Sequence, residues 1–277
     1  MSYHAPTQLE DALRIAAAGG GKVVAGGTDV YPSMVQGQQP DAFLDITRID
    51  GLRGITPVDD GLRIGAATTW TDVIRADLPP AFDALKQAAR EVGSVQIQNA
   101  ATVTGNLCNA SPAADGVPPL LILDAQVELA SAARGVRQVP LCDFITGVRQ
   151  TVRAEDELVT ALHIPHPPAG SASAFEKLGS RRYLVISITM TAALVVCDGD
   201  GVIRQAQVAV GACSAVAQRL HLLEDDLIGQ RATDIRVNPA HLGALSPISD
   251  VRGSAAFRED IVTTQCLRAI RRAACHE

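Results

Sequence analysis

Apolar residues recur every three or four positions near the start of the chain, and farther on they form short blocks between glycine-rich turns. The stripe over residues 9–17 predicts a helix, which a T-x-x-E capping box at Thr7 would open and the glycines at 19–21 would end. KVVAGG and AFLDI predict two strands, joined by a short helix that starts at Thr28 or Asp29. This first stretch is therefore expected to form a compact β-α-β unit.

The next stretch predicts a second unit of hairpins and helices. ITPV and LRIGA flank a turn at residues 59–61, and residues 134–135 mark the turn of a second hairpin. Thr69, with an acid three residues later, would start a helix, and a longer helix is expected over residues 80–92. The apolar block at 158–164 predicts a further strand.

Pro, Gly and Ser dominate residues 165–173, which makes this stretch the best domain boundary. Beyond it, SITMTAALVVCD and VIRQAQVAVGA predict two strands around a turn at 199–201, followed by helices near 220–228 and 259–272. The expected fold class is α+β. Two small mixed units would come first and a sheet-plus-helices domain second, with bounds at about 1–53, 54–167 and 168–277.

Composition narrows the class of protein. The 277 residues are 47% hydrophobic and carry a net charge of −6, which is typical of a globular protein and argues against a nucleic-acid or anionic-membrane surface. The N-terminal residues lack the features of a signal peptide and no long apolar span follows, so we expect a cytoplasmic protein. The six cysteines and six histidines show no metal-ligand spacing, and no serine lies in a G-x-S-x-G context, so the sequence indicates neither a metal site nor a hydrolase.

The first candidate binding segment is VVAGGTDV, residues 23–30, here named the glycine loop. Gly26 and Gly27 would let the backbone approach a pyrophosphate closely, and Thr28 adds a hydroxyl at a predicted helix start. Neither a GxGxxG fingerprint nor a GK[ST] phosphate loop is present. A glycine-rich turn that only lets strand and helix pack is an equally supported interpretation.

The second candidate lies in NAATVTGNLCNASPAAD, residues 99–115, expected to be an ordered polar loop before a buried apolar run. Its part TVTGN, residues 102–106, is here named the threonine segment. Thr102, Thr104 and Asn106 offer side-chain donors there, and a glycine allows a tight turn. Asp115 either accepts a hydrogen bond from a ligand's ribose hydroxyl or ring N–H, or caps the element that follows.

Several segments occur in an order and at a spacing that carry a resemblance. They are AGGTD, P-x2-FLDITRIDGLRGI, IGAATTWTDV, ATVTGNLCNASPAAD, LLILDA, FEKLGSRRYLVISI and the later GACSAVAQR. Together they resemble the FAD-binding subunit of the xanthine dehydrogenase and carbon monoxide dehydrogenase group of molybdenum hydroxylases. The resemblance covers nearly the whole chain, so it is much more specific than either candidate segment alone.

This resemblance implies a two-subdomain, PCMH-like FAD-binding domain, with FAD extended between the two front units. The glycine loop and the threonine segment would hold its pyrophosphate, Asp115 would line the same cleft, and Lys177 and Tyr183 would approach the flavin from the C-terminal domain. The expected cofactor-binding residues are Val23, Val24, Ala25, Gly26, Gly27, Thr28, Asp29, Val30, Thr102, Val103, Thr104, Gly105, Asn106, Asp115, Lys177 and Tyr183.

Three of these residues keep a second interpretation. Thr104 stands where the family commonly has the first glycine of T-x-G-G-N, and its Cβ narrows the conformations open to that backbone. Lys177 has the alternative of a surface charge with its stem laid along apolar groups. For Tyr183, packing in the core is the alternative.

The resemblance also implies a function, which is electron transfer inside a larger oxidoreductase, with no catalytic side chain assigned in this chain. A molybdopterin-binding large subunit would hydroxylate a substrate such as a purine, and a two-cluster 2Fe-2S small subunit would send electrons to the FAD held here. NAD or another acceptor would then receive them. Two other interpretations stay open: a stand-alone flavin oxidoreductase that uses NADH, and a flavin-less structural subunit of the same complex.

Overall fold

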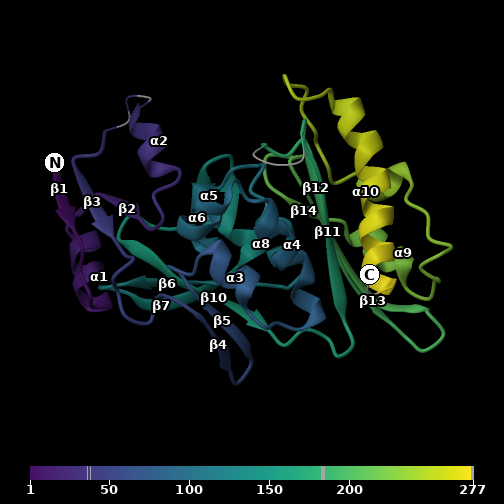
Figure 1. Cartoon of the computed structure of the whole chain (residues 1–277), viewed down its shortest axis with the longest axis horizontal. Coiled ribbons are helices and arrows are strands. Elements are labelled where there is room, and N and C mark those ends of the chain that lie inside the picture. The colour runs from purple at the N-terminus through teal and green to yellow at the C-terminus, as the bar shows by residue number, and fades with distance from the viewer. Residues whose placement is uncertain (36, 38, 182–184, 276–277) are drawn as a thin grey trace.

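The computed structural model describes residues 1–35, 37, 39–181 and 185–275. Its three main sheets follow one another along the long axis of the molecule, and a group of short helices lies between the second and third sheets (Figure 1). The architecture is α+β, as predicted, with a two-part front region and a C-terminal region of one sheet and helices. None of the helices in these ranges is both long enough and apolar enough to cross a membrane.

The first unit is a small parallel sheet with two crossover helices. Its strands lie in the order β1-β3-β2, and the predicted β-α-β unit is confirmed by the parallel pairing of β2 with β3. The prediction of a capping box at Thr7 was wrong. The N-cap is Gln8, in extended backbone, so Thr7 lies outside the helix. The carbonyl oxygen of Thr7 instead accepts from Asp50 N at 3.1 Å. The elements are β1 (Ser2–His4), α1 (Leu9–Ala17), β2 (Lys22–Val24), α2 (Val30–Val35) and β3 (Ala42–Asp45).

The second unit is an antiparallel sheet with short helices packed on one of its faces. Both predicted hairpins are present as β4/β5 and β6/β7, and the strand order is β4-β5-β10-β6-β7. Thr69 and Asp72 form the predicted capping box, with Asp72 N donating to Thr69 Oγ1 at 3.2 Å. Further elements are β4 (Ile55–Val58), β5 (Gly61–Gly65), α3 (Trp70–Arg75), α4 (Asp83–Glu91), α7 (Val117–Leu121), β6 (Gln126–Ser131), β7 (Gly135–Pro140), α8 (Leu141–Phe144), β8 (Ile145–Gly147), β9 (Gln150–Thr151) and β10 (Glu157–Pro165), with a 3-10 turn at Pro80–Phe82.

The stretch expected to be a polar loop before Asp115 is largely helical, so that expectation was wrong. It contains the end of α5 (Val95–Ala100) and all of α6 (Val103–Asn109). Thr102, one of the polar residues that suggested a loop, caps α6, since its Oγ1 accepts from Gly105 N, and Ser94 Oγ caps α5 by accepting from Ile97 N.

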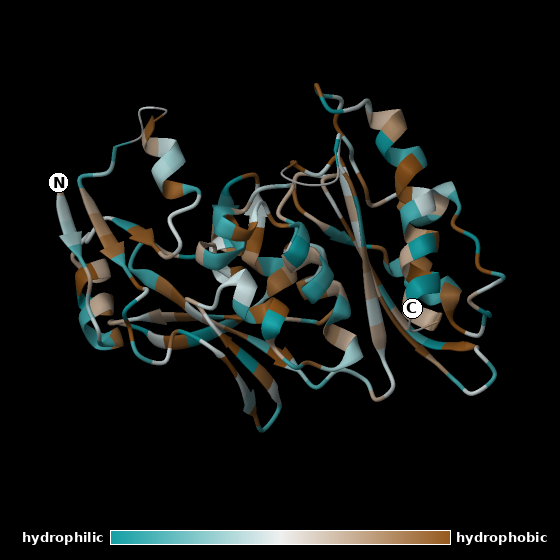
Figure 2. Cartoon of the chain, in the orientation of Figure 1, coloured by the Kyte–Doolittle hydropathy of each residue, from teal (hydrophilic) through white to brown (hydrophobic). Residues whose placement is uncertain are grey.

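The C-terminal region is a four-stranded antiparallel sheet backed by one long helix. The two strands predicted around the turn at 199–201 are β12 and β13, and the unpredicted β11 pairs with β12. Around the C-terminal helix, apolar and polar residues alternate in Figure 2, and its apolar side packs on β11 and β12. The elements are β11 (Ala172–Leu178), β12 (Thr189–Cys197), β13 (Ile203–Gly211), β14 (Gln218–Arg219), α9 (His221–Leu227) and α10 (Ala255–Cys275), with a 3-10 turn at Pro239–Leu242.

Candidate functional site

A cavity of about 880 Å³ lies between the first unit and the helices of the second. This volume falls in the upper part of the range of roughly 300–1,000 Å³ that ligand sites occupy. The first unit contributes mainly residues 22–33, and the second contributes residues from α3, α5, α6 and the stretch 149–159. The cavity brings together most of the predicted site residues, namely Val23, Ala25, Gly26, Gly27, Thr28, Asp29, Val30, Thr102, Thr104, Gly105 and Asn106.

Two positions of the glycine loop require glycine, because a side chain would collide with neighbouring residues and because one of them has a positive φ. A Cβ on Gly26 would collide with the backbone of Ala100 and Ala101, so the loop touches the second unit through bare backbone. Gly27 has a φ of +70°, and a Cβ there would collide with the Tyr31 ring. Packing therefore requires these glycines, and the same bare backbone forms one wall of the cavity.

The threonine segment opens helix α6 at the opposite wall. Thr102 caps the helix, and a Cβ on Gly105 would fall 2.7 Å from the Thr102 hydroxyl, so glycine preserves the cap. Thr104 Oγ1 donates to Ala66 O at 2.5 Å and is therefore occupied within the protein. Asn106 Oδ1 accepts from Gly116 N at 3.2 Å. The segment is thus held rigidly by its own side chains.

Of the predicted site residues that the structure describes, four do not line this cavity. Val24 and Val103 are core residues, 2% and 0% exposed. Asp115 and Lys177 lie beside the cavity and form an ion pair of 2.7 Å, in which the two side chains are only 10% and 6% exposed. The interpretation of Lys177 as a surface charge is therefore wrong. Tyr183 lies outside the described residues.

The Asp115–Lys177 pair joins the second unit to β11 of the C-terminal region. Lys177 Nζ also donates to Glu91 O at 3.2 Å, and Ser187 Oγ donates to Asp115 Oδ1 at 2.5 Å. Burial raises the pKa of the Asp115 carboxyl above its ordinary value, while Lys177 and Ser187 act in the opposite direction. A buried cation is thus held next to the cavity, one residue from Val92, which lines it.

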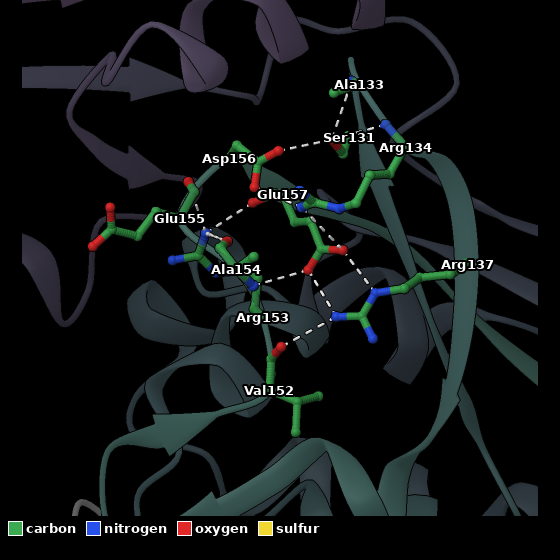
Figure 3. Close-up of polar contacts among 10 residues, drawn as sticks. All are labelled: Ser131, Ala133, Arg134, Arg137, Val152, Arg153, Ala154, Glu155, Asp156 and Glu157. Atoms are coloured by element: carbon green, nitrogen blue, oxygen red, sulfur yellow. Dashed lines mark hydrogen bonds and ion pairs between the residues drawn. The ribbon is translucent and has the colours of Figure 1, made fainter.

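Sequence reasoning missed the side chains that the stretch 149–159 adds to the cavity, above all Arg149, Arg153 and Glu157. Glu157 is 2% exposed and accepts from Arg137 Nε and Nη2 at 2.7 and 2.8 Å (Figure 3). These hydrogen bonds with Arg137 are the main cause that lowers the pKa of the Glu157 carboxyl. The sequence signal is VRQTVRAEDE, a mixture of charges that is more typical of a solvated surface.

The basic side chains of the cavity carry charge that no carboxylate neutralises. Within the described ranges, Lys22, Arg149 and Arg153 form no ion pair with a carboxylate, whereas Glu157 is paired with Arg137. Cys108 is exposed on the cavity wall, where the surrounding protein raises the pKa of its thiol and the charges of Arg153 and Lys22 oppose that rise. Asp29 is a further carboxylate in the lining and has no ion pair among the described residues, so three cations outnumber one unpaired carboxylate and the cavity suits an anionic ligand.

Comparison with known proteins identifies the family. Residues 1–167 match the family model of the FAD binding domain in molybdopterin dehydrogenase, and residues 173–273 match that of the CO dehydrogenase flavoprotein C-terminal domain. The chain belongs to this family of FAD-binding dehydrogenase subunits. It is 34% identical over 282 residues to the xanthine dehydrogenase FAD-binding subunit of Escherichia coli O157:H7, covering 97% of this chain and 94% of that protein.

Two further relatives agree with the family assignment. The nicotinate dehydrogenase FAD-subunit of Eubacterium barkeri is 36% identical over 220 residues, which cover 76% of this chain and 73% of that one. The carbon monoxide dehydrogenase of Hydrogenophaga pseudoflava superimposes with a TM-score of 0.89 at 25% identity, over 99% of this chain and 97% of that one. The resemblance and the FAD cofactor expected from the sequence are therefore confirmed.

The cavity fits FAD on features of the structure itself. Its cations match the two negative charges of a pyrophosphate, and the glycine loop forms the wall that faces them from the first unit. Trp70 lines the cavity with its side chain fully buried, and its Nε1 finds no hydrogen-bond partner among the described residues. This nitrogen has no surface open to the cavity, so Trp70 contributes part of the wall and offers no donor to the ligand.

Proposed function

We propose that this protein is the electron-transfer subunit of a molybdenum hydroxylase complex. It would take electrons from a two-cluster 2Fe-2S small subunit and pass them through FAD to NAD or another acceptor, while a molybdopterin-binding large subunit oxidises the substrate. The observation that carries the proposal is the electropositive cavity between the two front units, beside a buried cation from the C-terminal region. Bound FAD supplies the electron chemistry, and the protein supplies geometry and electrostatics.

Within this proposal the glycine loop and the threonine segment hold the pyrophosphate from opposite walls of the cavity. Thr102 and Asn106 present polar side chains, and the backbone of the glycine loop presents N–H groups. The rigid cap of α6 fixes these donors before the cofactor binds, so little ordering free energy is lost on binding. The proposed FAD-binding domain covers residues 1–167, with subdomains at about 1–53 and 54–167, and the C-terminal domain covers 168–277.

Asp115 and Lys177 would act at the flavin end. Lys177 places a positive charge near Val92, and a cation beside the flavin ring stabilises negative charge on the reduced cofactor. Asp115 and Ser187 hold that ammonium in place and couple it to the second unit. The pair therefore serves both to dock the C-terminal domain and to tune the cofactor.

The test is to purify the native complex through a tag on this subunit. We expect flavin and iron–sulfur absorption together, one FAD per chain released on denaturation, and bleaching of the flavin band when the substrate of the large subunit is added. Flavin bleached by NADH in the isolated chain, with no iron co-purifying, would instead support a stand-alone flavin oxidoreductase. A colourless subunit in an intact iron-containing complex would leave only a structural role.

A further inference from the structure

We infer that Arg153 anchors the AMP half of FAD and makes the cavity selective for the dinucleotide over FMN. The inference rests on the proposed FAD site and adds to it a residue outside the glycine loop and the threonine segment. Arg153 lines the cavity, is half-buried, and belongs to the stretch between β9 and β10. It is a binding residue and takes no part in electron transfer.

One end of the cavity lies against the C-terminal region. Trp70 and Val92 line this end, and Glu91, the neighbour of Val92, accepts a hydrogen bond from Lys177. Lys177 comes from β11, at the C-terminal side of the central helices in Figure 1. The proposed function puts the flavin ring here, beside the buried cation.

The other end lies over the first unit. It is lined by Lys22, Arg153 and Leu158, and Leu158 packs in the same apolar cluster as the first unit's core. Helix α1, at the far end of the molecule from β11 in Figure 1, packs against β10 where Leu158 lies. An extended dinucleotide with its flavin at the Lys177 end therefore brings its AMP half to Arg153.

The guanidinium of Arg153 is fixed before any ligand binds. Its Nη1 donates to Ala154 O at 2.9 Å and to Glu157 O at 2.8 Å (Figure 3). Glu157 is itself clamped by the two hydrogen bonds from Arg137, and its Oε2 accepts from Ala154 N at 2.8 Å. Arg137, on the hairpin β6/β7, thus stabilises the turn that fixes Arg153. The Arg153 side chain therefore loses little conformational freedom when a ligand binds.

The remaining donors of Arg153 are available to a ligand. Its Nε and Nη2 make no hydrogen bond, and the side chain makes no ion pair, with any residue that the structure describes. Lys22, on β2 of the first unit, lines the same cavity. A guanidinium donates to phosphate and ribose oxygens and stacks on adenine, so this end matches the chemistry of AMP.

Arg149 lines the same cavity but is committed to the protein. Its Nη1 donates to Asn109 O at 3.1 Å, and its backbone N donates to Ala110 O at 2.9 Å. Its φ of +61° shows a backbone held in the left-handed region by these contacts. Arg149 therefore fixes the end of α6, and the structure assigns AMP recognition to Arg153.

The experiment measures the dissociation constants of FAD and FMN for the apoprotein of the full chain. The variants are Arg153→Gln, Arg153→Lys and, as a matched control, Arg204→Gln, which removes an exposed guanidinium in the C-terminal region. We expect R153Q to weaken FAD binding by about tenfold, the loss of one charge-assisted hydrogen bond. FMN, which lacks the AMP half, should bind R153Q, R204Q and the wild type alike, and R153K should keep part of the FAD affinity.

Equal FAD affinities of R153Q and R204Q, in a wild type that binds FAD, would overturn this inference alone. Equal weakening of FAD and FMN would also overturn it, because the contact would then lie in their shared half. A wild type that binds no FAD would overturn the proposed function and the inference together.

A second measurement needs no variant at this position. Cys108 opens into the cavity near Arg153, so ADP, which carries no flavin, should slow alkylation of Cys108 in the wild-type apoprotein. Peptide mass spectrometry separates Cys108 from Cys142 and Cys275, which are also exposed but do not line the cavity, so their alkylation should not change. An unchanged Cys108 rate at saturating ADP would contradict an AMP site at this end.

Discussion

Two buried carboxylates border the cavity from opposite ends, and their surroundings move their acidity in opposite directions. Arg137 is the main cause that lowers the pKa of Glu157, whereas burial is the main cause that raises the pKa of Asp115. Both carboxylates accept short hydrogen bonds from a cation, with N–O distances of 2.7 Å. The contact itself therefore does not explain the difference.

The two pKa shifts differ in sign because the cationic partner is exposed in one pair and buried in the other. The Arg137 side chain is 44% exposed and keeps its contact with water, while the Lys177 side chain is only 6% exposed. Glu157 also receives two parallel hydrogen bonds from a planar guanidinium, and Asp115 receives one each from an ammonium and a hydroxyl. The half-exposed Glu157–Arg137 pair stabilises a turn. The buried Asp115–Lys177 pair joins the second unit to the C-terminal region, and its formation costs free energy because both charges lose their contact with water.

Lys177→Met should have the largest effect, because it leaves Asp115 buried with only the Ser187 hydroxyl. We expect the free energy of unfolding to fall by about 3–5 kcal/mol, measured by urea denaturation followed by circular dichroism. The double variant D115N/K177M should recover much of the loss, since no charge remains buried. If K177M alone is as stable as the wild type, the pair is not the desolvated junction described here.

Arg137→Met should have a smaller effect, because the Ala154 N–H and the more distant Arg134 still face Glu157. We expect a loss of about 2 kcal/mol in the free energy of unfolding and a weaker affinity for FAD, since the turn that fixes Arg153 is loosened. Arg137→Lys keeps the charge and loses the paired hydrogen bonds, so its values should be intermediate. An unchanged FAD affinity of R137M would show that the hydrogen bonds between Arg137 and Glu157 do not contribute to FAD binding.

Local sequence signals predicted many of the helices and hairpins, whereas the strand pairing and the full lining of the cavity depend on long-range packing. The capping box at Thr69 and the hairpin at residues 134–135 depend on neighbours within a few positions, and both are present. The pairing of β5 with β10 joins residues about a hundred positions apart, and no local pattern predicts it. Arg153 lines one cavity with the glycine loop only because such long-range pairings fold the chain, so its charge could not be distinguished from a surface charge in the sequence.

Stability should depend on pH with opposite signs at the two carboxylates. Glu157, with a folded pKa lowered from 4.5, stabilises the protein above pH 4.5, and this contribution is lost as the pH falls through the folded pKa. Asp115, with a folded pKa raised from 3.8, contributes fully below pH 3.8, and its contribution is lost as the pH rises through the folded pKa. Urea denaturation from acid to neutral pH should therefore show a smaller acid loss in E157Q and a smaller decline with rising pH in D115N.

Ser187→Ala should give the smallest effect, and it tests whether the hydroxyl shares the work of Lys177. Ser187 Oγ donates to Asp115 Oδ1 in a buried setting, so its removal should cost about 1 kcal/mol in the free energy of unfolding. Because Ser187 lowers the pKa of Asp115, S187A should raise that pKa further and extend the decline of stability to higher pH. In the D115N background the serine no longer faces a carboxylate, so S187A should leave the pH profile unchanged there. An equal change in both backgrounds would mean that Ser187 acts through packing of the chain before β12, and that depth alone sets the acidity of Asp115.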